Sequence, residues 1–146
     1  MTRSTLWPTH VQSEKFHPEA SLPTTQRFED LIAWQKARTL VRNVYKAVKG
    51  EAVRRDWGFC DQIRRAAVSA MSNIAEGFEK NTQREFHQFL GHARASAGEV
   101  RSLLYVGLDV GYFAQLVFDE LMSLTDEVCR IIGGLRSAVA RRLEPA

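Results

Sequence analysis

The sequence lacks the features that mark membrane, secreted and disulfide-rich proteins. No apolar run approaches the roughly 18 residues that a membrane-spanning helix needs. The first residues lack the basic start and continuous apolar core of a signal peptide, so we expect a cytoplasmic protein. The chain has only two cysteines, Cys60 and Cys129, and each stands among apolar residues at helical spacing. We therefore expect two small buried hydrophobic side chains rather than a disulfide or metal ligands.

Catalytic and metal-binding signatures are also missing from the sequence. It contains no glycine-rich phosphate loop and no recognisable nucleophile motif. A di-iron site in a helical bundle needs Glu-x-x-His pairs, whereas Glu85 and His87 stand two residues apart and His87 and His92 stand five apart. The other histidines, His10 and His17, lie far from these in the chain. We predict a protein that is not an enzyme and that uses no metal ion or cofactor.

No segment alternates between apolar and polar residues as a strand does. Three of the four prolines fall within residues 1–26, where they oppose helix formation, so this segment is predicted to be an irregular or disordered arm. Helical periodicity governs the rest of the chain. It predicts an all-α fold, an antiparallel up-down-up-down four-helix bundle over residues 27–142. The predicted helices span residues 29–49, 57–78, 83–109 and 116–141.

Capping residues support two of these helix starts. Asp56 is a candidate N-cap for the second helix, and Thr82 with Glu85 forms a capping box before the third. Since only a few residues separate the second helix from the third, the two are expected to be antiparallel neighbours. The connection over residues 51–55 is predicted to be short and charged.

Apolar residues recur every three or four positions along each predicted helix and define the expected core. In the first helix they are Leu31, Trp34, Ala37 or Arg38, Val41, Val44 or Tyr45, and Val48. In the second they are Phe59, Ile63, Ala66, Ala70 and Ile74, and in the third Phe86, Leu90, Ala93, Ala97, Val100, Leu104 and Leu108. In the fourth they are Val117, Leu121, Leu124, Val128, Ile131 or Ile132, Leu135 and Val139. Most aromatic residues fall on these stripes, so base stacking on the surface is not expected.

Glycines interrupt the third and fourth predicted helices. Gly91 and Gly98 each cost about 1 kcal/mol of helix propensity relative to alanine. We expect close backbone approach between the second and third helices to offset that cost. Gly133 and Gly134 are predicted to fray or kink the fourth helix.

The net charge of +3 is distributed unevenly along the chain. Between Arg42 and Arg65, seven basic side chains stand against three acidic ones. This excess permits a polyanionic partner, although a solvated helix face is the simpler interpretation. The candidate nucleic-acid-binding residues are Arg42, Lys46, Lys49, Arg54, Arg55, Arg64, Arg65 and Arg84.

A polar strip made of Arg65, Ser69, Asn73 and Glu76 runs beside the apolar stripe of the second helix. It has three interpretations: an internal hydrogen-bond network, a subunit interface, or arginines that contact phosphates. Glu76 has the chemistry of a general base, but no partner for it is visible in the sequence, so a structural role is preferred.

Three stretches together resemble a known family. They are FEDLIAWQKA at residues 28–37, QIRRAAVSAMSNIAEGF at residues 62–78 and EFHQFLGHARASAGEVRSLL at residues 85–104. In this order they are similar to the intervening-sequence proteins, small bacterial four-helix bundle proteins often encoded within large-subunit ribosomal RNA genes. The resemblance covers about residues 27–140. Ala70 and Met71 replace the usual isoleucine and proline, so the second helix is expected to be less interrupted here.

The resemblance implies a homo-oligomer, because related bundles, including accessory proteins of diversity-generating retroelements, form pentameric rings with basic surfaces. We therefore expect a non-enzymatic, oligomeric bundle that acts as a nucleic-acid-associated or adaptor protein. It would bind RNA or DNA without sequence specificity. The alternative is a scaffold that binds a partner protein and has no nucleic-acid role.

Overall fold

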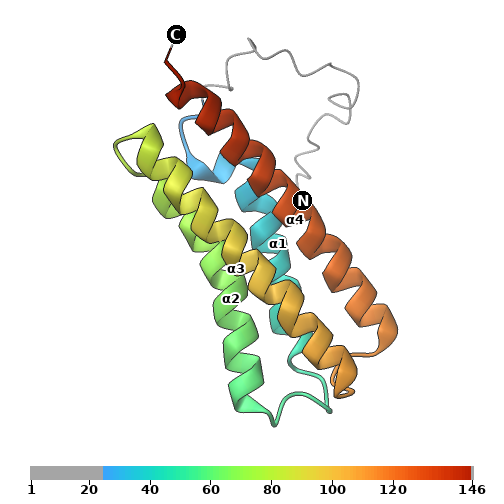
Figure 1. Ribbon diagram of the computed structural model, residues 1–146. Coiled ribbons are helices and arrows are strands. Elements are labelled where there is room, and N and C mark those ends of the chain that lie inside the picture. The colour runs from blue at the N-terminus through green and yellow to red at the C-terminus, as the bar shows by residue number, and fades with distance from the viewer. Residues whose placement is uncertain (1–24, 146) are drawn as a thin grey trace, which may run out of the picture.

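The computed structural model describes residues 25–145, and over these residues it is an antiparallel bundle of four α-helices without strands (Figure 1). Consecutive helices pack against each other, and α1 also packs against α4, which closes the bundle. The predicted all-α, up-down-up-down fold is confirmed. The predicted arm falls almost entirely outside the described residues, as do His10 and His17. The helices are α1 (Ile32–Ala47), α2 (Trp57–Phe78), α3 (Gln83–Asp109) and α4 (Gln115–Leu143), preceded by a 3₁₀ turn, η2 (Phe28–Asp30).

The bounds of α2 and α3 match the prediction. Local capping residues define where each helix begins. The Asp56 carboxylate accepts a hydrogen bond from the Phe59 backbone N–H at 3.0 Å. The Thr82 hydroxyl accepts one from the Glu85 N–H at 3.2 Å. Each cap satisfies a donor that the first turn of a helix leaves unpaired.

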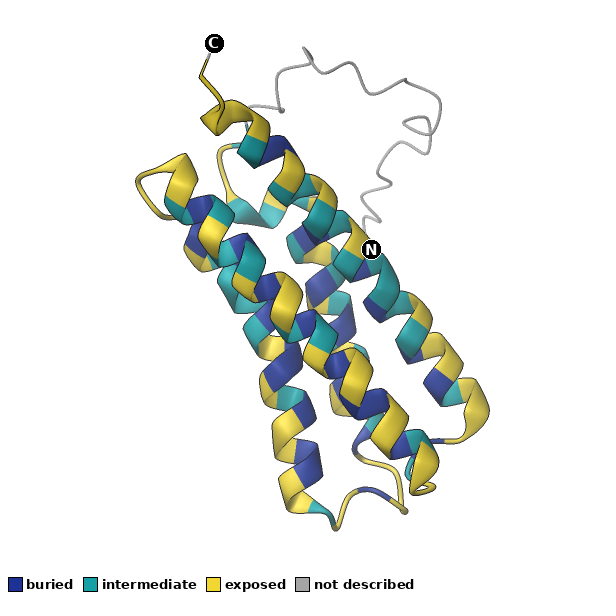
Figure 2. Ribbon diagram, viewed as in Figure 1, coloured by how far each residue is buried: buried dark blue, intermediate teal, exposed yellow. Residues whose placement is uncertain are grey.

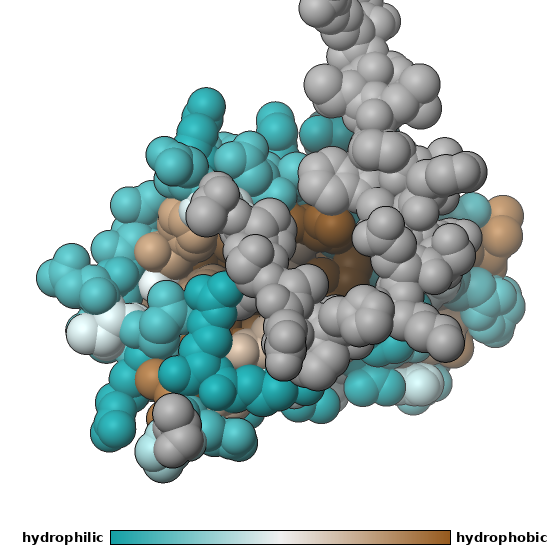
Figure 3. Space-filling view, turned by 90° about the horizontal axis from the view of Figure 1, so that it is seen from above, coloured by the Kyte–Doolittle hydropathy of each residue, from teal (hydrophilic) through white to brown (hydrophobic). Residues whose placement is uncertain are grey.

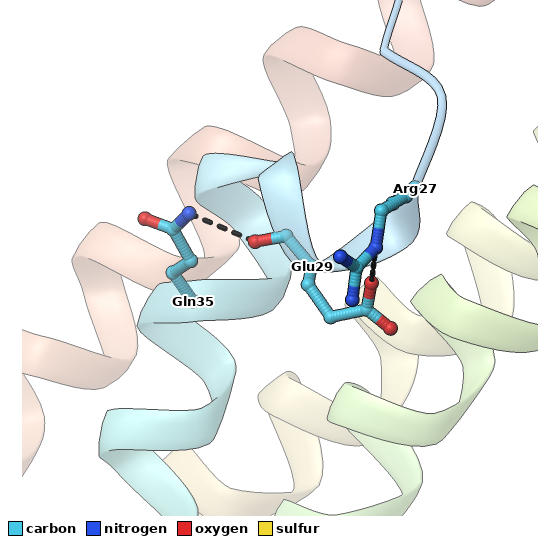
Figure 4. A network of polar contacts seen from close by, with 3 residues as sticks. All are labelled: Arg27, Glu29 and Gln35. Carbon is cyan, nitrogen blue, oxygen red and sulfur yellow. Dashed lines mark hydrogen bonds and ion pairs between the residues drawn. The ribbon is translucent and has the colours of Figure 1, made fainter.

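The first helix begins three residues later than predicted. Leu31 is extended, with φ −72° and ψ 125°, and separates α1 from η2. Polar contacts hold this arrangement (Figure 4): the Gln35 side-chain amide donates to the Glu29 carbonyl at 2.9 Å, and Arg27 pairs with the Glu29 carboxylate at 2.8 Å. The 3₁₀ turn thus replaces the first turn of the predicted helix.

The same helix also ends two residues early, at Ala47 instead of Lys49. The connection that follows is not wholly a solvated charged link, because Val53 is fully buried in the core. The Cys60 thiol donates to the Val53 carbonyl at 3.3 Å. This contact ties the connection to the first turn of α2.

The buried residues form one continuous core between the helices, with the exposed residues on the outside (Figure 2). Seen along the bundle from the end where α4 terminates, hydrophobic side chains are visible near the centre, and most of the side chains around them are hydrophilic (Figure 3). All five apolar positions predicted for α2 are buried. Those predicted for α3 are also buried except Leu108, which is half-buried. None of the four helices is long and apolar enough to cross a membrane over the described residues.

The predicted core positions of α1 are partly wrong. Ala33 and Leu40 are buried although neither was predicted, and Tyr45 is 44% exposed. The other predicted positions differ in how far they are buried. Ala37, Val44 and Val48 are buried, Leu31, Trp34 and Val41 are half-buried, and Arg38 is exposed. The buried face is therefore rotated by one position from the stripe that the larger side chains suggested.

The core face of α4 differs in a similar way. Phe118, Thr125 and Ala138 are buried beside the predicted Leu121, Val128, Ile132 and Val139. Thr125 is tolerated there because its hydroxyl donates to the Leu121 carbonyl at 2.6 Å. The predicted Val117, Leu124, Ile131 and Leu135 are half-buried and pack against the core.

Close approach between α2 and α3 occurs at a different glycine from the two predicted. A β-carbon on Gly77 would lie 2.6 Å from the Phe89 β-carbon, so only glycine fits there without a shift. Gly98 has no other atom within 4 Å of such a β-carbon. Gly91 faces the Arg136 guanidinium of α4, at 3.2 Å, instead of α2. The prediction for Gly91 and Gly98 is therefore wrong.

Helix α4 is continuous through Gly133 and Gly134, contrary to the predicted weak point. Arg94 of α3 lies over Gly133, and Arg136 of α4 lies over Gly91. Each of the two helices therefore places one arginine over a glycine of the other. This reciprocal packing supports α4 from one side at its least helix-prone position.

Candidate functional site

Seven of the eight candidate basic residues belong to one part of the bundle, around the end where α1 connects to α2 (Figure 1). All seven are exposed except Arg64, which is half-buried. We call them the basic surface: Arg42, Lys46, Lys49, Arg54, Arg55, Arg64 and Arg65. The eighth residue, Arg84, is in the first turn of α3, at the opposite end of the bundle. The structure therefore does not bring Arg84 together with the others.

Two of the seven cations are paired with acidic neighbours. Arg54 lies 2.9 Å from Glu51, and Arg65 lies 2.8 Å from Asp61. Both pairs are open to solvent, where ion pairs contribute little to stability, so either arginine is available to a stronger anion. Within the described part of the chain, the other five form no ion pair: Arg42, Lys46, Lys49, Arg55 and Arg64.

A shallow groove opens between the end of α1 and the start of α2. Its walls carry Lys49, Arg54 and Arg64, and Trp57 stands on its rim with 79% of the residue exposed. Val48 and Cys60, both buried, form its floor. Trp57 belongs to none of the predicted core stripes, and its exposure provides an aromatic surface that the sequence analysis did not expect.

A second shallow groove adjoins the first along the same seam. It is lined by Tyr45, Asp61, Arg65, Val68 and Ser69, and Arg64 lines both grooves. The Arg64 guanidinium carbon is 5.7 Å from the centre of the Tyr45 ring, a cation–π geometry. Two exposed aromatic residues therefore flank one arginine within the basic surface.

Asp56 holds the backbone next to Trp57 in place. One carboxylate oxygen caps α2, and the other accepts a hydrogen bond from the Tyr112 hydroxyl in the connection between α3 and α4. The Tyr112 and Phe59 hydrogen bonds lower the pKa of Asp56, because both stabilise its charged form. The same bond raises the pKa of Tyr112. Asp56 thereby joins both connections at this end of the bundle.

The two cysteines lie in different environments. Cys60 is buried beneath the groove, as predicted, and burial raises the pKa of its thiol. Cys129 is half-buried in α4 against the core, and there too burial raises the thiol pKa. A raised pKa leaves little thiolate at neutral pH, so neither environment favours a nucleophile.

The polar strip of α2 divides into an inner and an outer part. Ser69 bonds to Ser96 of α3 at 2.8 Å between hydroxyl oxygens, and the Asn73 amide donates to the Ser69 hydroxyl at 3.0 Å. Arg65 and Glu76 are exposed instead. The inner part is a hydrogen-bond network between two helices, and Ser96 is the member that sequence reasoning missed. Only its place in the small-residue stretch of α3 hinted at this role.

Sequence reasoning also missed a basic groove between α3 and α4. Arg94, Arg101 and Arg130 line it together with Asp126 and Cys129. Arg101 is paired with Asp126 at 2.8 Å. The one signal in the sequence was the seven-residue spacing of Arg94 and Arg101, which places both on one helix face.

The arrangement offers cation and aromatic surfaces rather than a reactive centre. Across residues 25–145 no three histidine, cysteine or acidic side chains are grouped so as to hold a metal ion. Glu76 is exposed and has no hydrogen-bonding partner in that range that would position it as a base. What the site can do chemically is attract anions and present flat aromatic rings to a ligand.

Comparison with known proteins gives a family and a fold. The family model described as 23S rRNA-intervening sequence protein matches residues 29–134. A crystal structure from Bacteroides thetaiotaomicron VPI-5482, described as a protein with unknown function from the S23 ribosomal protein family, is similar with a TM-score of 0.67. At 18% identity the similarity covers 72% of this chain and 98% of that chain. No curated protein sequence matches.

Proposed function

Since the chain belongs to the 23S rRNA-intervening sequence protein family, we propose that it is a non-catalytic, oligomeric bundle that binds RNA or DNA without sequence specificity through the basic surface. One observation carries the proposal: seven cations lie around one end of the bundle, and five of them have no ion pair within the described residues. Arg84 is left out because it lies at the other end.

In binding of this kind, the protein's cations neutralise phosphates and displace the counterions around them, and the release of these counterions provides most of the affinity. If the five unpaired cations each neutralise one phosphate, the logarithm of the association constant falls with the logarithm of salt with a slope of about −4.5 for duplex DNA. The same contacts give a slope of about −3.5 for a single strand. Sequence changes in the nucleic acid have little effect, because phosphate contacts position a protein without reading bases.

A titration of the nuclease-treated protein with labelled RNA and duplex DNA at several salt concentrations tests this. We expect Lys46→Glu to weaken binding several-fold and to flatten the salt dependence. Arg84→Glu makes the same change in net charge at the far end of the bundle and serves as the matched control. Equal losses in the two variants, or binding that is insensitive to salt, contradict the proposal.

The oligomeric state is proposed on exposed apolar side chains outside the basic surface. Val106 and Val110 near the end of α3 are 44% and 57% exposed, and Leu116 at the start of α4 is 69% exposed. Large apolar groups left in water at one end of a bundle favour contact with another protein surface. We expect light scattering to give a multiple of the chain mass, with a ring such as a pentamer as the proposed form. A monomer contradicts this part of the proposal.

The same apolar residues favour a second candidate function, a scaffold that recruits a partner protein. A partner that survives nuclease treatment and is lost on Val110→Asp supports the scaffold. A partner whose capture depends on Lys46 and is lost after nuclease treatment supports the nucleic-acid function instead.

A further inference from the structure

Trp57 is the most exposed large hydrophobic residue in the described chain, and it stands among cations. It is 79% exposed and is the first residue of α2. The charged residues that line the same groove are Lys49, Arg54 and Arg64. Acidic side chains are absent from the residues that line this groove. A flat apolar ring with positive charge on its flanks is complementary to a base attached to a phosphate chain.

We infer that the basic surface binds single-stranded nucleic acid, with one base stacked on Trp57 and the adjoining phosphates contacted by Lys49, Arg54 and Arg64. This inference rests on the proposed function and names the form of the nucleic acid. In a duplex each base face is covered by its neighbours, and a protein ring reaches it only by separating a base step. A single strand presents its base faces freely. Every base has such a face, so stacking adds affinity without sequence preference.

The backbone beside Trp57 is held in place by the contacts of its neighbour. The preceding residue, Asp56, is bonded both to the first turn of α2 and to Tyr112. The same groove is lined by two buried residues, Val48 at 4% and Cys60 at 3% exposure. The indole is therefore presented from a supported backbone, which reduces the backbone ordering that binding of a base requires.

The path of the strand follows the seam between α1 and α2. From Trp57 it passes Arg64 to Tyr45, the second exposed aromatic residue, over which Arg64 already lies. On α1, Arg42 and Lys46 are four residues apart, about 6 Å of helix rise, and Lys49 follows two residues after the helix ends. This row places cations beside the aromatic residues for a backbone that runs parallel to the helix.

The experiment compares single-stranded and hairpin oligonucleotides of equal phosphate number, binding to the full nuclease-treated chain at low and moderate salt. We expect Trp57→Ala to weaken single-strand binding about 5- to 150-fold, the range found when one stacking side chain is removed. Hairpin binding should change less than twofold. The salt slope should stay the same, because no charge is removed. Trp57→Phe should restore part of the lost affinity.

Tyr105→Ala is the matched control, because Tyr105 is an aromatic residue of α3 that is 52% exposed and lies outside the basic surface. It should leave both affinities unchanged. Thermal melts followed by circular dichroism establish that each variant is folded. Equal effects of Trp57→Ala on the two oligonucleotides, or no effect on either, overturn the inference while salt-dependent binding keeps the proposed function.

Two further results have different meanings. If neither oligonucleotide binds the unaltered protein, the proposed function fails, and the inference fails with it. If Trp57→Ala abolishes capture of a nuclease-insensitive protein and leaves single-strand affinity unchanged, the ring is a protein contact and the inference is overturned.

Discussion

Replacing Gly77 with alanine tests the closest approach between α2 and α3. The new β-carbon would lie 2.6 Å from the Phe89 β-carbon and 3.1 Å from Cδ2 of Phe86. The Phe89 atom is attached directly to the backbone, so a rotamer change does not relieve the contact and the helices must separate. Gly98→Ala is the matched control, because nothing lies within 4 Å of the corresponding position in the middle of α3.

The two substitutions have opposite expected signs. Alanine in place of glycine improves helix propensity by about 1 kcal/mol at either site. Overpacking costs about 1–3 kcal/mol, and the rigid Phe89 contact places Gly77 in the upper half of that range. We therefore expect Gly77→Ala to lower the free energy of unfolding by about 1–2 kcal/mol. Gly98→Ala should raise it by about 0.5–1 kcal/mol.

Urea denaturation followed by circular dichroism measures both values at one protein concentration. Thermal melts should separate the two variants by about 3–12 °C, since 1 kcal/mol corresponds to about 2–4 °C in a domain of this size. A Gly77→Ala variant as stable as the parent would refute the close packing of α2 on α3. A Gly98→Ala variant that is destabilised relative to the parent, more so when both are measured again in concentrated protein, would show that another chain covers this face of α3.

Three other predictions concern polar and thiol groups. Ser69→Ala should lower the free energy of unfolding by about 1 kcal/mol, and adding Ser96→Ala should cost less than the sum of the single changes, as a urea double-mutant cycle would show. The folded-state pKa of Asp56 lies below its unfolded value, so its contribution to stability is present above that unfolded pKa, about 4, and is lost as the pH falls through the folded pKa. Asp56→Asn should remove this part of the loss, as melts of both proteins at a series of acidic pH values would show. An equal dependence of stability on pH in the two proteins would contradict the Asp56 hydrogen bonds. In the native protein, iodoacetamide should modify Cys60, which is 3% exposed, more slowly than the half-buried Cys129. Mass spectrometry measures both rates, and equal rates would contradict this prediction.

The fold was predictable wherever the signal was local. Asp56 and Thr82 cap their own helices through side chains within three residues, so the bounds of α2 and α3 followed from the sequence. The start of α1 did not, because the break at Leu31 is held by a side chain six residues from its partner, between Gln35 and Glu29. Periodicity carries no information on such a contact.

The core of α1 shows a different limit. Tyr45 and Val44 are adjacent and both suit an apolar stripe, yet only Val44 is fully buried. A rotation of about 100° separates neighbouring positions on a helix, and small residues such as Ala33 decide which side faces inward. The smaller members of the stripe were therefore the better guide.

The sequence predicted the excess of positive charge, but only partly which residues lie together on one surface. The excess between Arg42 and Arg65 maps to one end of the bundle because a connection and the helix ends beside it carry most of it. Arg84 is separated because the antiparallel course of α2 carries the chain to the other end before α3 starts. The exposure of Trp57 was not evident, because the predicted stripe of α2 begins at Phe59 and periodicity does not determine how far the first residue of a helix is exposed.

The antiparallel course of the four helices also makes the bundle a spacer. The described chain enters at η2 and leaves after α4 at the same end, whereas Trp57 and the cations around it lie at the other (Figure 1). The 22 residues of α2 alone span about 33 Å between those ends. A fluorophore or affinity tag joined after Leu143 is thus held roughly one helix length from the groove. Energy transfer from such a label to a bound strand would measure that length directly.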